Sequence, residues 1–361
     1  MTDRNGAEHL SVVMTTEPVA DVTQTTATDV ASSSLRGMDF YFQCAVVVIG
    51  LVGTAANALI LYAMVASKQH KKRMLIFHQN VLDFVSSLLM ALTYALKLCN
   101  FYLTGLGGYW FCMLILSENL NWCAILASKV NLVFVTVDRY LKVVRPAWTK
   151  EKLRKWMIYS AMALTWISGF VHVWALTFPT SQVIDGVCYA YVTWKSRESQ
   201  MAYGIFYFLS FYIFILATFI FCYWRILVAI RRQAKVMAGH AAAGPSTSQA
   251  KSNQIQSNII KTMILVSAFY AISDLPNNVY YLLLNIHAQL TLLESSYYAC
   301  LFISFLYFCT NPFIYATKFD PVKRVLLGLI PCKKTGQPVE SIEITASRVV
   351  ATASRKRQTQ N

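Results

Sequence analysis

The sequence has little charge for its length and little of the polar surface that a water-exposed fold needs. Only 14% of its 361 residues are charged, 56% are hydrophobic, and the mean hydropathy is +0.45. Soluble domains carry about 25% charged residues. The composition therefore excludes an ordinary soluble domain and predicts a protein that faces lipid.

Metal-binding and catalytic patterns are also lacking. The nine cysteines include no CxxC pair, and no histidine cluster has the spacing of metal ligands, so we expect no metal and no cofactor. No nucleophile, base and oxyanion donor are arranged together on either side of the membrane, so an enzyme is not expected. The net charge of +15 comes from Lys and Arg residues between apolar runs, so a nucleic-acid partner is not expected either.

The N-terminal segment lacks the basic start and apolar core of a secretory signal, and it has no glycosylation sequon. Residues 1–39 are rich in Thr, Ser, Ala and Val without helical period, so we expect a disordered extracellular tail. The first apolar helix would then direct membrane insertion. Residues 333–361 are polar and are expected to form a disordered cytoplasmic tail.

What the sequence does have is a series of apolar runs, each long enough to cross a bilayer core of about 30 Å with roughly 20 helical residues. A short amphipathic stretch, 320–329, follows them and is expected to lie on the membrane surface. Cys332 just beyond it is a candidate for palmitoylation, with a free interfacial thiol about equally plausible. The predicted fold is an all-α membrane protein, a seven-transmembrane helix bundle with a surface helix, over residues 40–332. The runs are 40–66, 75–99, 110–142, 156–178, 201–231, 257–286 and 296–317.

Positive charge predicts the orientation, because short loops rich in Lys and Arg stay cytoplasmic. Such residues gather at 68–73, 142–155, 231–251 and 318–334, whereas the alternate loops hold few. This alternation predicts a multi-pass protein with the N-terminus outside and the C-terminus in the cytoplasm.

Three kinds of short motif then occur in order, each on the run where a known family has it. Asp138, Arg139 and Tyr140 end the third run, matching a DRY motif. Asn311, Pro312 and Tyr315 lie in the seventh, matching NPxxY. With these motifs, the chain resembles the rhodopsin-like (class A) G protein-coupled receptors over about residues 40–332. The helix-marking residues of the family are matched by Gly53, Asn57, Asp83 and Trp166.

The resemblance implies a function and a set of partners. Arg139 would engage a heterotrimeric G protein after the sixth helix swings outward, and Tyr223 would turn inward on activation. Pro276 and Pro312 would act as hinges, since proline removes a helix hydrogen bond. Arrestin and receptor kinases are possible further partners, and the plasma membrane is the expected location.

The chain departs from the family at two charged positions. Asp274 stands where the family usually has a tryptophan, two residues before Pro276, and Lys129 follows Ser128 in the third helix. Because intramembrane charges face the bundle interior and find partners, we hypothesise that Lys129 and Asp274 form an ion pair that holds the resting state. The alternatives are that Lys129 pairs with Asp83 or is neutral. The expected polar core is Asn57, Asp83, Ser128, Lys129 and Asp274.

Other departures concern switches of the family. Ile215 replaces the fifth-helix proline, and Gln256 stands where many members have an acid paired to Arg139. The family's sodium pocket is only partly matched, because Tyr307 and Phe308 replace small polar residues. By analogy with the family, Cys112 would be bonded to Cys188, although Cys112 lies somewhat farther from Arg139 than is usual.

Two ligand classes are disfavoured by the resemblance. Phe305 occupies the place of the retinal-binding lysine, and Asn121 occupies the place of the aspartate of amine receptors. Peptides and neutral small molecules are favoured, because aromatic and amide groups are mixed at the pocket positions. The alternative function is a transporter or proton relay through Asp83, Lys129 and Asp274. The expected ligand contacts are Asn121, Trp122, Ile125, Tyr207, Phe211, Asn277, Tyr281 and Leu301.

Overall fold

A computed structural model of the chain describes residues 25–191, 194–239, 247–286, 294–318 and 320–329. Seven helical segments in it are long and apolar enough to cross a membrane, as the sequence predicts. They span Gly37–Ala66, Met74–Lys97, Gly105–Val144, Lys155–Thr180, Arg197–Gln233, Ser257–Ile286 and Ser295–Lys318.

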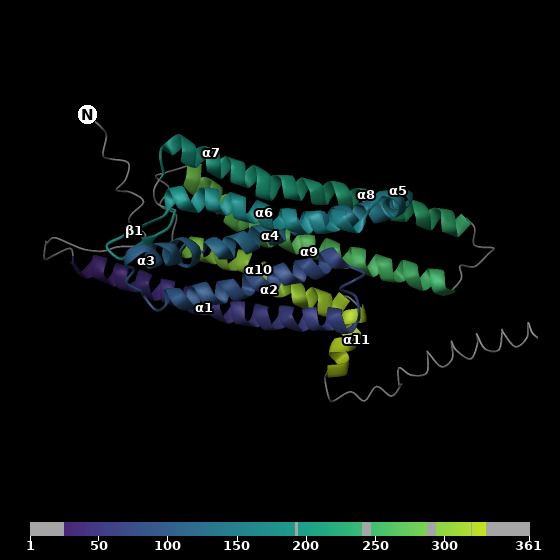
Figure 1. Ribbon diagram of the computed structural model, residues 1–361, viewed down its shortest axis with the longest axis horizontal. Coiled ribbons are helices and arrows are strands. Elements are labelled where there is room, and N and C mark those ends of the chain that lie inside the picture. The colour runs from purple at the N-terminus through teal and green to yellow at the C-terminus, as the bar shows by residue number, and fades with distance from the viewer. Residues whose placement is uncertain (1–24, 192–193, 240–246, 287–293, 319, 330–361) are drawn as a thin grey trace, which may run out of the picture.

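These segments lie side by side as one elongated bundle (Figure 1). The N-terminal end of α1 and the small β-sheet lie at one end of the bundle, and α5 and α11 lie at the other. The elements are α1 (Thr25–Ala66), α2 (Met74–Lys97), α3 (Gly105–Phe111), η2 (Cys112–Leu116), α4 (Asn119–Val144), α5 (Pro146–Lys152), α6 (Lys155–Thr180), β1 (Gln182–Ile184), β2 (Val187–Tyr189), α7 (Arg197–Phe208), η3 (Leu209–Ile213), α8 (Phe214–Gly239), α9 (Thr247–Ile286), α10 (Glu294–Lys318) and α11 (Asp320–Leu329).

The third span is the central one. Of its most apolar stretch 67% is buried, against 22% for the fourth span, whose apolar side chains therefore face outward. This inside-out distribution is what a bundle in lipid requires, since an apolar side chain loses nothing by facing hydrocarbon. The polar side chains of the bundle, by contrast, turn inward from the third span and its neighbours.

Two spans contain a π-helical turn. In the third span, η2 (Cys112–Leu116) is followed by Glu118 in the left-handed conformation, with φ of 60°, before α4 begins. The wider turn and the break take up extra chain, which accounts for the long spacing between Cys112 and Arg139. In the fifth span, η3 (Leu209–Ile213) ends shortly before the buried Ile215, the position where the expected proline is missing.

At the extracellular-side end predicted from the charge pattern, β1 and β2 form an antiparallel hairpin, with Val183 opposite Cys188. Its two turn residues, Asp185 and Gly186, both have positive φ, 50° and 78°. This is the backbone that a two-residue hairpin turn requires and that Asp-Gly adopts readily. The hairpin is the one addition to the all-α prediction within the described residues.

The ends of the chain differ from the sequence expectation in one respect. α1 begins at Thr25, inside the segment that we assign to the N-terminal tail, although its membrane-spanning part begins at Gly37. The predicted surface helix is present as α11 and turns away from the bundle axis after α10 (Figure 1). Cys332 and the tail 333–361 lie outside the described residues.

Candidate functional site

A buried ion pair lies in the middle of the bundle. Lys129 Nζ on α4 lies 2.7 Å from Asp274 Oδ2 on α9, and the two side chains are only 1% and 2% exposed. Lys129 therefore contacts the carboxylate of the sixth span and not Asp83. A pair this well shielded is stable only when further hydrogen bonds satisfy the carboxylate.

The Asp274 carboxylate has those further donors. Asn278 Nδ2, one turn along α9, donates to Oδ2 at 2.6 Å, and the Ser304 hydroxyl of α10 donates to Oδ1 at 2.6 Å. Lys129 Nζ also lies 5.8 Å from the centre of the Tyr270 ring. The carboxylate thus joins three spanning helices, and its charge is matched by one cation and two neutral donors.

Asp83 is the centre of a second buried network. Its Oδ1 accepts from Gln79 Nε2 at 3.1 Å and from the Ser128 hydroxyl at 2.6 Å, and its Oδ2 accepts from Asn311 Nδ2 at 2.9 Å. Gln79 also donates to Ser128 at 2.6 Å. Three spanning helices, α2, α4 and α10, therefore meet at this carboxylate.

The sodium pocket of the family is only partly matched around Asp83. The rings of Tyr307 and Phe308 are buried next to one another, with centroids 4.9 Å apart. A hard cation needs several oxygen ligands, whereas the amide nitrogens of Gln79 and Asn311 point at Asp83. Asn57 lies apart from this network, and its Nδ2 donates to the carbonyls of Gly53 and Phe308.

At the end of the bundle that the charge pattern predicts to be cytoplasmic, Arg139 is paired within its own motif. Arg139 Nη2 lies 3.2 Å from Asp138 Oδ2, and Lys142 Nζ lies 2.7 Å from Asp138 Oδ1. Burial, and then the charge of Arg139, lowers the pKa of the nearby Arg73 to about 10, so two cations face one another there. Tyr140 packs its ring 5.9 Å from that of Phe221. The side chain of Gln256 is outside the described side chains.

Tyr223 joins three helices at the same end. Its hydroxyl lies 3.1 Å from Thr136 Oγ1 of α4 and 2.8 Å from Ser267 Oγ of α9, and it donates to the Met263 carbonyl at 3.2 Å. The Tyr315 side chain is 2% exposed, and its hydroxyl has no hydrogen-bond partner. Pro312 lies inside α10, which continues through it.

The predicted ligand contacts fall into two adjoining groups. One is aromatic: Tyr207 stacks on Phe211 at 5.5 Å and meets Tyr281 edge-on at 5.2 Å. The other holds Ile125 and Leu301, and Trp122 packs against both groups. Asn277 of α9 is 7% exposed.

Asn121 is the unusual member of the predicted pocket. Its side chain is completely buried, yet neither its Oδ1 nor its Nδ2 has a hydrogen-bond partner. An unpaired buried amide costs about 1–3 kcal/mol, so this group is a candidate for satisfaction by a ligand or water. Phe305, at the place of the retinal-binding lysine, is buried between the rings of Tyr94 and Trp122.

A cavity of about 360 Å³ opens on the lipid-facing surface of the bundle, between the fourth and fifth spans. It is mostly apolar, and its polar lining consists of Ser168, His172 and Ser210. His172 and Phe211, whose ring centres are 4.4 Å apart, both line the cavity. Phe211 also belongs to the aromatic group of predicted ligand contacts. The cavity therefore lies behind the predicted ligand contacts, on the side that faces lipid.

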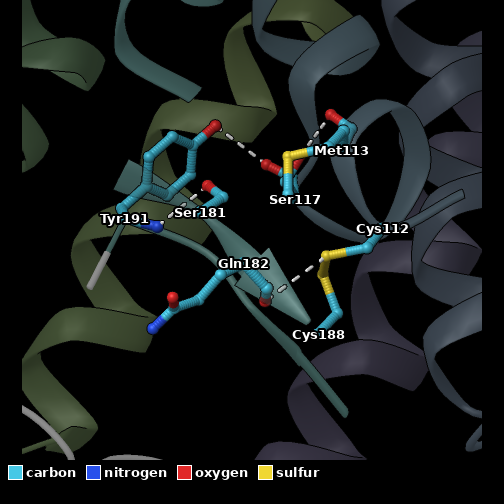
Figure 2. Close-up of a disulfide and its surroundings, with 7 residues drawn as sticks. All are labelled: Cys112, Met113, Ser117, Ser181, Gln182, Cys188 and Tyr191. Carbon is cyan, nitrogen blue, oxygen red and sulfur yellow. Dashed lines mark hydrogen bonds between the residues drawn. A yellow bond between two sulfur atoms is a disulfide. The ribbon is translucent and has the colours of Figure 1, made fainter. Parts of the chain in front are cut away.

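The loop that carries the hairpin lies at the end of the bundle that the charge pattern predicts to be extracellular. The Cys112–Cys188 disulfide is present and ties β2 to the third span (Figure 2). Beyond the hairpin, the Tyr191 hydroxyl donates to the Ser117 carbonyl at 2.8 Å, and its backbone nitrogen donates to Ser181 Oγ. Burial raises the pKa of the Tyr191 hydroxyl, so it stays a donor. The loop is thus held to the third span by a covalent bond and a hydrogen bond.

Sequence reasoning missed the residues that complete both buried networks. Asn278 and Ser304 hold Asp274, and Gln79 holds Asp83, but each is a common neutral residue with no motif of its own. Their only sequence signal is a polar side chain in an apolar run. Asn278, one turn from Asp274, could have been found by helical spacing.

Comparisons with known proteins agree with this geometry. Residues 56–315 match the family described as 7 transmembrane receptor (rhodopsin family). The chain is 26% identical to Melanopsin-B of Gadus morhua over 235 residues, which is 60% of this chain and 35% of that protein, so it spans about a third of that relative's length. The crystal structure of squid rhodopsin has the same fold, with a TM-score of 0.65 at 17% identity over 84% of this chain and 93% of that chain.

The family match covers well over half of the chain and includes both the Asp138-Arg139-Tyr140 motif and the Asn311-Pro312-Tyr315 motif. Members of this family are signalling receptors and not enzymes, and the seven spans make this a multi-pass membrane protein. The chain therefore belongs to the rhodopsin family of seven-transmembrane G protein-coupled receptors.

Proposed function

We propose that the chain is a plasma-membrane receptor that binds an extracellular peptide or neutral small molecule and activates a heterotrimeric G protein. Its N-terminus would lie outside and its C-terminus in the cytoplasm, where arrestin and receptor kinases are further expected partners. Activation would be a change of conformation that ligand and G protein both favour, with no catalytic residue of its own.

The observation that carries the proposal is the buried pair of Lys129 with Asp274. Removing one partner of a buried pair leaves an uncompensated charge, so α4 and α9 are held together as long as both partners stay. Outward movement of α9 at its cytoplasmic end would weaken this contact. Many members of the family hold the resting state with an acid paired to Arg139, and this chain has Gln256 at that position. The pair of Lys129 with Asp274 would therefore act as the resting-state lock instead.

The ligand would enter between the loop held by Cys188 and the aromatic group of Tyr207, Phe211 and Tyr281. The unpaired amide of Asn121 offers one donor and one acceptor, which suits a peptide or carboxamide group. Phe305 has no amine with which an aldehyde ligand could form a Schiff base. Asn121 has no negative charge to pair with the ammonium group of an amine ligand. This supports a neutral or peptidic ligand.

The test is G protein activation in cells that express wild type and Arg139→Ala at equal surface levels, with a panel of G protein subtypes. Basal activation by wild type that is lost in the variant supports the proposal and identifies the coupling partner. Substrate uptake or a charge current with no activation of any subtype, even with peptide libraries added, would support the transporter alternative through Asp83, Lys129 and Asp274.

A further inference from the structure

A continuous series of hydrogen bonds, buried except for its partly buried first member, runs from the fourth span to the Asp83 carboxylate. Trp166 Nε1 of α6 donates to His78 Nε2 at 3.2 Å, and His78 Nδ1 lies 2.9 Å from Asn131 Oδ1 of α4. Asn131 Nδ2 donates to Gln79 Oε1 at 2.8 Å, and Gln79 then donates to Asp83. This series of hydrogen bonds links α6, α2 and α4. It ends at the Asp83 carboxylate, which also accepts a hydrogen bond from Asn311 of α10.

The direction of every bond in this series is fixed by its two ends. The Trp166 indole can only donate, and the Asp83 carboxylate in its ionised form can only accept. The orientation of Asn131 is fixed independently, because its Nδ2 also donates to the Leu75 carbonyl at 3.2 Å. Its Oδ1 must therefore face His78, so His78 Nδ1 must carry a hydrogen.

His78 thus meets two independent requirements at once. Its Nε2 has to accept from Trp166, and its Nδ1 has to donate to Asn131, which together define the neutral imidazole with its proton on Nδ1. A protonated His78 would carry hydrogen on both nitrogens, and its Nε2–H would then face the Trp166 N–H. Two donors cannot form a hydrogen bond with each other, so protonation of His78 would break the hydrogen bond that connects α6 to this network.

The charged groups around His78 are few among the described residues. Its own helix has Asp83 and, at the far end, Lys97, and Arg73 stands just before the helix. On α4, Lys129 is paired with Asp274, and Asp138 is paired with both Arg139 and Lys142. α6 has the exposed Lys155 at its start, and the cytoplasmic half of α1 and the middle of α10 bring none. A proton-dependent change in this region is therefore assigned either to His78 or to Asp83, and a variant of His78 separates them.

We propose that His78 is a positioning residue that docks α6 onto the Asp83 network only in its neutral form, so that cytoplasmic acidification loosens the resting bundle. His78 lies one helical turn from the start of α2 at the end that the charge pattern places in the cytoplasm, so protons of that compartment are the relevant ones. The signalling consequence rests on the proposed function above, whereas the hydrogen-bond arrangement does not.

The first test measures the arrangement itself. Nitrogen-15 spectra of the full chain in lipid nanodiscs, labelled at histidine, should contain one neutral signal with the proton on Nδ1 that disappears in His78→Asn and changes in Trp166→Phe. His70→Asn, in the first loop, is the matched control and should leave that signal in place. A cationic His78 at neutral pH, or one with its proton on Nε2, would overturn the proposal whatever the receptor signals.

The second test measures basal G protein activation while cytoplasmic pH is clamped from about 8 to about 5.5, the range over which a histidine titrates. Acidification should raise activation of wild type and His70→Asn by about 2- to 10-fold, the factor that one lost hydrogen bond produces. His78→Asn keeps one donor and one acceptor, so its basal activation should be low and independent of pH. The basal activation of Trp166→Phe should be raised and also independent of pH. A flat wild type, or a pH response that persists in His78→Asn, contradicts the proposal.

Discussion

Lys129 of α4 and Asp274 of α9 form an ion pair of 2.7 Å that is almost completely shielded from solvent. These two residues stand 145 positions apart in the chain, and neither position is ordinarily charged in the family that the sequence resembles. Each residue therefore accounts for the presence of the other, because either alone would be an unpaired charge at membrane depth.

Loss of either partner should destabilise the fold strongly. Lys129→Met or Asp274→Leu should each lower the free energy of unfolding by about 3–5 kcal/mol, because the remaining charge stays buried without its partner. Thermal unfolding of the purified chain measures this. The double variant should recover most of the loss. The control is Glu151→Gln, whose partner Lys152 is 60% exposed and which should cost less than about 1 kcal/mol.

The Tyr223 hydroxyl should contribute measurably to the packing of the half of the bundle that is predicted to be cytoplasmic. Tyr223→Phe removes the contacts with Thr136 and Ser267 and should cost about 1–2 kcal/mol by the usual value of a buried hydrogen bond. The same substitution at Tyr159, whose side chain is 55% exposed, should leave the unfolding temperature unchanged. Equal effects at the two positions would mean that the hydroxyl network of Tyr223 contributes nothing.

The close contact of α4 and α6 depends on Gly169. A Cβ at this position would lie 2.4 Å from the Cys123 carbonyl oxygen, which is backbone and cannot move aside. Gly169→Ala should therefore destabilise the bundle by about 1–3 kcal/mol, the cost of overpacking. Gly107→Ala is the control, because nothing lies within 4 Å of the added atom. A stable Gly169→Ala would show that the two helices can separate freely.

The disulfide should be needed for the outer end of the bundle. Cys112 and Cys188 stand 76 positions apart in the sequence, and losing a disulfide of this kind costs about 2–5 kcal/mol. Cys188→Ser should lower surface expression and the unfolding temperature, whereas Cys99→Ser, at an exposed free cysteine, should do neither. If the two variants behaved alike, the tie between β2 and the third span would be dispensable.

Much of the architecture could be predicted from the sequence because it depends on simple quantities. Run length predicts the spans, and the cost of charge in hydrocarbon predicts that Lys129 and Asp274 turn inward, although not which acid Lys129 meets. The π-helical turn at Cys112–Leu116 could not be predicted, because a shift in backbone hydrogen bonding leaves the pattern of apolar residues almost unchanged.

The neutral members of the site were harder still. His78, Asn131 and Ser304 come from three different helices, and a polar residue inside a helix often bonds only to its own backbone. Nothing in their spacing shows that they meet residues from other spans. Their roles follow from helix packing, which places side chains of distant sequence position face to face.

The measurement that tests the account most directly is basal G protein activation by wild type, Lys129→Met, Asp274→Asn and the reversed pair Lys129→Asp with Asp274→Lys, all at equal surface levels. If the pair locks the resting state, both single variants should signal above wild type and the reversed pair should return toward it. Single variants that reach the surface and signal like wild type would contradict the lock.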